Sequence, residues 1–110
     1  ELLARAVRDH LADCLVTLPT LLEREAAGSL HFYLANLSGL RRALFPSLQP
    51  AYDAWHGERN AAPLARLVRR GEAHWLEAAR QLTATYHRDP AQGDAQLNAL
   101  ATSDLASLRL

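Results

Sequence analysis

The chain has 110 residues, the length of a single small domain, and its hydrophobic fraction of 49% is too high for a disordered segment. Its formal net charge is zero, so charge indicates neither direct contact with nucleic acid nor attraction to an anionic membrane. No apolar run is long enough to cross a bilayer, and the single cysteine excludes an internal disulfide.

The apolar residues are mostly leucine and alanine, a composition typical of helices. Isoleucine is absent, and the only β-branched aliphatic side chains belong to Val7, Val16 and Val68. Leucine and alanine lose little conformational entropy in a helix, whereas pleated sheets favour β-branched and aromatic residues. We therefore predict an all-α domain.

The first predicted helix covers residues 2–27. A spacing of three and four places its apolar residues on one face, which comprises Val7, Leu11, Leu15, Leu18 and Leu22. Pro19 interrupts this helix, and Thr20 and Glu23 have the spacing of a capping box. The pattern predicts a kink at Pro19, with a restart of the helix as the alternative.

The second predicted helix covers residues 30–45. Gly28 and Ser29 separate it from the first helix, since glycine suits the position after a helix and serine caps the next one. Pro46 ends it. The segment that follows is irregular, and we expect a short connecting helix over residues 50–57.

The clearest helical pattern runs over residues 61–87, with Asn60 as its cap, and Asp94 caps a last helix beyond it. Short links between amphipathic helices favour an antiparallel bundle of about four long helices plus one short connecting helix. We expect residues 1–110 to form this single domain. Because neither end carries a helix cap, we also expect it to be a piece of a longer protein.

Arginines of the 61–87 helix are the first candidates for ligand contacts. Arg66, Arg69 and Arg70 cluster there, and guanidinium groups bind carboxylates and phosphates through paired hydrogen bonds. We select Arg69, Arg70 and Trp75 because Gly71 between them leaves a dent in which a ligand could lodge. The alternatives are a solvated face for the arginines, a core position for Trp75 and a close helix contact at Gly71.

Tyr52 and Trp55 are the second set of candidate ligand contacts. Both fall in the irregular segment, and binding residues are often carried on such segments by a rigid scaffold. The alternative is that these aromatic side chains close the end of the bundle.

His10 and Cys14 lie one helical turn apart and could supply half of a metal or haem site. No further motif supplies the other half. An unpaired cysteine more often packs as a small hydrophobic residue, so we predict no metal and no cofactor.

Motifs of catalysis are also missing, because the sequence has no Gly-rich phosphate loop and no nucleophile elbow. Asp9 and Asp13 fit surface ion pairs with nearby arginines. We predict that the domain is not an enzyme.

Residues 33–38 resemble the segment before the phosphoacceptor in the dimerisation helix of sensor histidine kinases. Gly39 stands where that family carries its histidine, so the resemblance implies no phosphoryl transfer.

Two functions fit these patterns. The first is a non-catalytic ligand-sensing or signal-relaying bundle of a larger bacterial signalling protein, similar in outline to the four-helix sensor domains of chemoreceptors and sensor kinases. It would bind a small molecule and form a homodimer through a helical face. The alternative is a helical protein-interaction module or the effector domain of a transcriptional regulator. It is favoured by leucines outside the main stripes, namely Leu3, Leu21, Leu34, Leu48 and Leu76.

Overall fold

The computed structural model describes residues 2–88 and 108–110, and for residues 85–88 the backbone alone. Its elements are α1 (Leu2–Ala12), the π-helix η1 (Asp13–Thr17), α2 (Leu18–Glu23), α3 (Ala27–Ala35), α4 (Gly39–Leu44), α5 (Leu48–Glu58) and α6 (Ala62–Arg88). None of the described residues forms a β-strand, so the all-α prediction is confirmed. None of the described helices is both long and apolar enough to cross a membrane.

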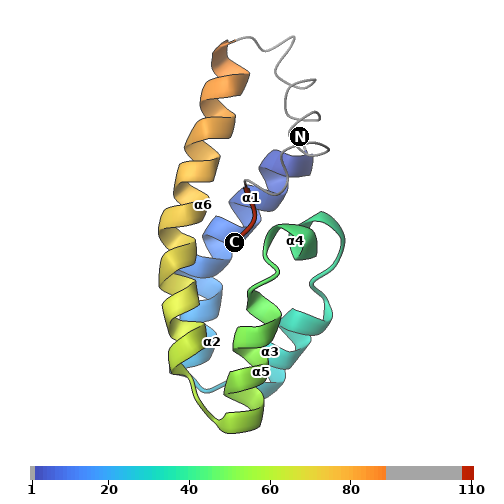
Figure 1. Ribbon diagram of the computed structural model, residues 1–110, viewed down its shortest axis with the longest axis vertical. Coiled ribbons are helices and arrows are strands. Elements are labelled where there is room, and N and C mark those ends of the chain that lie inside the picture. Colours follow the sequence, from blue (N-terminus) through green and yellow to red (C-terminus); the bar gives the residue numbers. More distant parts are fainter. Residues whose placement is uncertain (1, 89–107) are drawn as a thin grey trace.

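Two long helical rods organise the domain. The first comprises α1, η1 and α2, and it runs antiparallel to the second, α6 (Figure 1). Helix α6 packs against α1, η1, α2 and α5, so it is the central element, while α3 and α4 contact the first rod. The predicted set of about four long helices is not confirmed, because the described residues form two long rods and three shorter helices.

Pro19 does not stop the first rod. Proline cannot donate a backbone hydrogen bond, and its ring crowds the carbonyl four residues earlier in a regular α-helix. The wider π-helix directly precedes it, and the N–H of Leu18 donates to the carbonyl of Asp13, five residues back. We attribute the continuation of the helix past Pro19 to this wider turn.

The buried face of the first rod differs from the predicted stripe. It consists of Leu3, Ala6, Val7, His10, Cys14 and Leu18. Leu15, which was predicted to face inward, is 54% exposed, and Leu11 is only half-buried. Consequently His10 and Cys14 lie in the core and not at its border.

The prediction of one helix over residues 30–45 is wrong, because the chain breaks between α3 and α4. The side-chain amide of Asn36 donates to the carbonyl of Phe32 at 2.8 Å and satisfies the last turn of α3. Ser38 is extended, and Gly39 has a φ of 60°, a left-handed conformation that glycine adopts at little cost. Pro46 follows soon after α4, as expected.

The predicted boundary at Gly28 and Ser29 is also wrong. The first rod ends at Glu23, the reversal uses Glu25 with a φ of 51°, and both Gly28 and Ser29 lie inside α3. The short helix α5 and the long helix α6 are confirmed, and Asn60 caps α6 through its side-chain oxygen, which accepts from the N–H of Ala62. The last predicted helix lies outside the described residues, apart from Leu108–Leu110 beside α4 and α6.

The two rods approach each other closely at Gly71 of α6. A Cβ atom added to Gly71 would lie 2.5 Å from the sulfur of Cys14, which is closer than real side chains pack. Cys14 is itself fully buried, as is Trp75 one turn further along α6. Gly71 is therefore a helix-packing contact, the alternative to a ligand-binding dent.

Replacing Gly71 by alanine tests this contact. We expect Gly71→Ala to lower the free energy of unfolding by about 1 kcal/mol, because overpacking outweighs the better helix propensity of alanine. In a Cys14→Ala background the same change should instead raise it by up to about 1 kcal/mol. Gly57→Ala in α5, where nothing lies within 4 Å of the added atom, is the matched control. Equal effects in both backgrounds, measured by urea denaturation, would contradict the contact.

Candidate functional site

The five predicted ligand contacts do not meet in one place. Trp75 is completely buried in the core, and Tyr52 and Trp55 of α5 are almost completely buried. Arg69 and Arg70 are exposed on α6, and Arg70 lines an open cleft.

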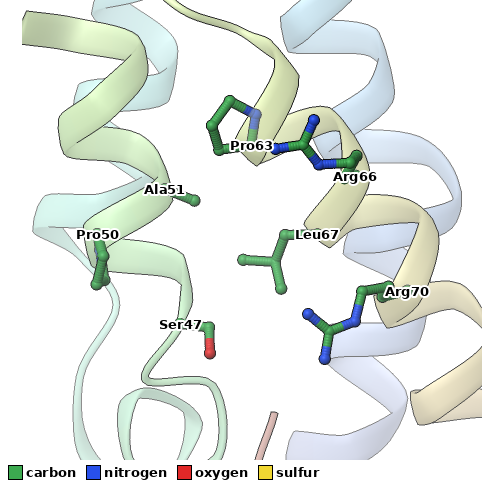
Figure 2. Close-up of a pocket in the computed structure, with 7 residues that line it drawn as sticks. All are labelled: Ser47, Pro50, Ala51, Pro63, Arg66, Leu67 and Arg70. Carbon is green, nitrogen blue, oxygen red and sulfur yellow. The ribbon is translucent and has the colours of Figure 1, made fainter.

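This cleft lies between the first turn of α5 and the first half of α6 and has a volume of about 370 Å³. It is lined by Ser47, Pro50, Ala51, Pro63, Arg66, Leu67 and Arg70. Figure 2 shows Ser47, Pro50 and Ala51 on one wall, the side chains from α6 on the other, and Leu67 projecting between them. We call it the α5–α6 cleft.

Two guanidinium groups give the α5–α6 cleft its chemistry. Arg66 and Arg70 are four residues apart, so they lie one above the other on the same face of α6. None of the side chains that line the cleft carries a carboxylate, and within the described part of the chain neither arginine forms an ion pair or a hydrogen bond. Two arginines at this spacing can bind one anion from two sides.

The remaining lining residues shape the cleft and leave it largely apolar. Pro50 and Pro63 occupy the first turns of their helices, where a missing N–H costs nothing. Each presents a rigid ring to the cleft, and Leu67 and Ala51 are buried beneath them. The cleft therefore suits a ligand that combines an apolar body with negative charge.

Sequence reasoning placed Arg66 in the arginine cluster but preferred Arg69 as a ligand contact. The two arginines of α6 that line the cleft are Arg66 and Arg70, and Arg69 does not line it. The helical spacing of four residues distinguishes Arg66 from Arg69, because Arg66 is four residues from Arg70 and Arg69 is adjacent to it. It identifies the pair that shares a face, although it does not say which face meets α5.

His10 and Cys14 lie in the core and do not line the cleft. The Nε2 atom of His10 donates to the carbonyl of Arg41 at 2.8 Å, and the ring stacks on Trp75 at 4.9 Å between centroids. Burial lowers the pKa of His10 below its ordinary value of 6.5, and burial raises the pKa of Cys14 to about 12. A buried neutral thiol is a poor nucleophile and a poor metal ligand. Among the residues that the structure describes, no three side chains form a metal-binding group.

Asp13 is bound by residues far away in the chain. It accepts a hydrogen bond from the hydroxyl of Tyr33 at 2.7 Å and forms an ion pair with Arg41 at 2.6 Å. The predicted surface ion pairs with nearby arginines are therefore wrong for Asp13. Burial raises the pKa of Tyr33, and its hydrogen bond to Asp13 acts in the same direction. This cluster ties the π-helix to α3 and α4.

Tyr52 connects α5 to α3 in the same way. Its hydroxyl lies 3.0 Å from Nδ1 of His31, and its ring stacks on His56 with centroids 5.7 Å apart. The aromatic side chains of α5 therefore pack the helix in place, and neither Tyr52 nor Trp55 lines the cleft.

The buried His10 predicts how stability depends on pH. Because the pKa of His10 is lower in the folded state, the contribution of His10 to stability is fully present above pH 6.5. This contribution is lost as the pH falls from there towards the pKa of the folded state. The loss can reach about 1.4 kcal/mol per pH unit, which corresponds to one proton. His10→Gln keeps a donor for the carbonyl of Arg41 but cannot be protonated, so we expect a flatter profile between pH 7 and 5. An unchanged slope in denaturation experiments would rule out His10 as its cause.

Comparison with known proteins identifies the family. A family model described as the C-terminal domain of a family of unknown function (DUF6866) matches residues 1–104. No curated protein and no solved structure matches the chain. Since the match covers nearly the whole length, the chain belongs to the family of DUF6866 C-terminal domains.

Proposed function

We propose that this chain is a non-catalytic ligand-sensing domain of a larger bacterial signalling protein, and that the α5–α6 cleft binds its ligand. The observation that carries the proposal is the pair of guanidinium groups of Arg66 and Arg70 in a cleft whose lining side chains include no carboxylate. The family description as a C-terminal domain fits a place within a longer protein.

The chemistry of the cleft favours a small ligand with two negative charges, such as a phosphate monoester or a dicarboxylate. Guanidinium groups bind phosphate and carboxylate oxygens through pairs of parallel hydrogen bonds, and two of them can compensate two charges. The lining includes neither histidine, cysteine nor carboxylate, so it offers no general base. Binding without turnover is the simplest use of these groups.

Helix α6 offers a route for relaying occupancy. A ligand held by Arg66 and Arg70 against the first turn of α5 would draw the two helices together, because it contacts both walls of the cleft. Helix α6 has 27 residues, so it is about 40 Å long and extends well beyond the cleft. A small rotation of a rigid helix is transmitted along its whole length.

The test uses phenyl phosphate and succinate as probes and acetate, which carries a single charge, as the control. All measurements are made at the same ionic strength. We expect the two dianions to raise the melting temperature and acetate to have little effect. In calorimetric titrations, Arg66→Ala and Arg70→Ala should each weaken binding roughly tenfold or more, the value of one charge-assisted interaction.

Arg69→Ala is the matched control, because Arg69 lies on the same helix and is exposed but does not line the cleft. It should bind the dianions as the unmodified chain does. The proposal fails if no dianion binds, or if Arg69→Ala weakens binding as much as Arg66→Ala and Arg70→Ala.

A second candidate is a protein-interaction or dimerisation module. It is favoured by Leu15 and Val16, adjacent residues of η1 that are 54% and 64% exposed. Exposed apolar pairs on a long helix are a common feature of helix–helix interfaces. Of the leucines outside the predicted stripes, Leu3, Leu34 and Leu48 are buried in the core and do not support this candidate.

Sedimentation equilibrium of the unmodified chain and of Leu15→Glu tests this second candidate. A homodimer through the first rod should sediment as a dimer, and the charged variant should sediment as a monomer because the interface would bury an unpaired carboxylate. A chain that remains monomeric over the accessible concentration range, or a variant that still dimerises, would exclude this interface.

A further inference from the structure

A second cavity lies on the other side of the first turn of α5. It has a volume of about 270 Å³ and is lined by Leu34, Leu37, Arg42, Phe45, Pro46 and Gln49. All these residues belong to the stretch that runs from the end of α3 through α4 to the start of α5. The break between α3 and α4 therefore creates this cavity, because one continuous helix could not surround it. We call it the α3–α5 cavity.

The inner surface of the α3–α5 cavity is apolar and built from the core. Leu34, Leu37 and Phe45 are almost completely buried. Phe45 packs edge-on against His10 and Trp75, with ring centroids 5.1 and 5.4 Å apart. The aromatic cluster behind Phe45 holds this wall in place, so the cavity is largely preformed.

One cationic side chain, that of Arg42, lines this apolar cavity. Arg42 is exposed and, unlike its neighbour Arg41, makes no ion pair with any residue that the structure describes. The amide nitrogen of Gln49 donates to Asp53 at 3.0 Å, and Asp53 itself does not line the cavity. The lining thus combines a hydrocarbon surface with one guanidinium group and one amide.

We propose that the α3–α5 cavity binds a small apolar monocarboxylate, with its carboxylate on Arg42 and its hydrocarbon part against Leu34, Leu37 and Phe45. A cavity of about 150 Å³ lined by apolar side chains binds benzene, as an engineered lysozyme cavity shows. The larger α3–α5 cavity has room for a ring or a chain of about six carbons with a carboxyl group. This site goes beyond the proposed dianion cleft and uses different residues.

Hexanoate is the probe for this proposal. Hexanol has the same tail without charge, hexylamine has the opposite charge, and acetate has the charge without the tail. We expect hexanoate to bind more tightly than all three, because only hexanoate matches both the apolar wall and Arg42. Calorimetry measures the affinities, and perturbation of the amide resonances of residues 34–49 locates the ligand.

Two variants test the residues that carry the site. Arg42→Gln should weaken hexanoate binding roughly tenfold or more, and because Arg42 is exposed the variant should retain the circular dichroism spectrum of the folded chain. Leu37→Phe should reduce binding by filling the cavity, while binding of the dianions in the α5–α6 cleft persists.

Arg66→Ala and Arg70→Ala distinguish this proposal from the proposed function. Both variants should bind hexanoate as the unmodified chain does, whether or not they bind dianions. The proposal is overturned if hexanoate does not bind, if Arg42→Gln binds it with unchanged affinity, or if binding is lost only in Arg66→Ala and Arg70→Ala. That last result would place hexanoate in the α5–α6 cleft.

Discussion

The close approach of the two long rods at Gly71 and Cys14 determines how the rest of the domain is arranged. Gly71 of α6 packs against the buried Cys14 of the first rod. Helix α6 therefore turns the face that carries Gly71 towards the core. Trp75 then packs on His10, and Phe45 packs on both rings, so the aromatic cluster fixes the end of α4 against the two rods. A side chain much larger than that of alanine at position 71 would push the two rods apart.

The orientation of α6 also determines which arginines border the α5–α6 cleft. At about 100° per residue, Arg69 lies about 200° from Gly71 and faces away from the core. Arg66 and Arg70 lie on the flank that meets α5, where they border the α5–α6 cleft. The first turn of α5 separates this cleft from the α3–α5 cavity, since Ser47, Pro50 and Ala51 line the former while Pro46 and Gln49 line the latter. Two cavities of different chemistry thus share one wall.

Much of the fold could be predicted from local sequence, and most of the site could not. The scarcity of β-branched residues predicts the all-α class, and Asn60 with the spacing that follows it predicts α6. The break after Asn36 was missed because the apolar spacing continues through it, so Leu30, Leu37 and Leu44 are buried in either case. The ion pair of Asp13 with Arg41 joins residues 28 positions apart and has no local signal. The choice between Arg66 and Arg69 likewise depends on the contact of Gly71 with a distant residue.

We propose that Arg66 and Arg70 together hold an anion between α5 and α6. The most direct measurement follows the Nε–Hε resonances of the arginine side chains while phenyl phosphate is added, since these nuclei report contact with the anion at each guanidinium group. The account predicts saturable shifts for Arg66 and Arg70 with one common dissociation constant, and no comparable shift for Arg69. Saturable shifts at Arg69 in place of Arg66 and Arg70 would contradict it, as would shifts at all exposed arginines that do not saturate.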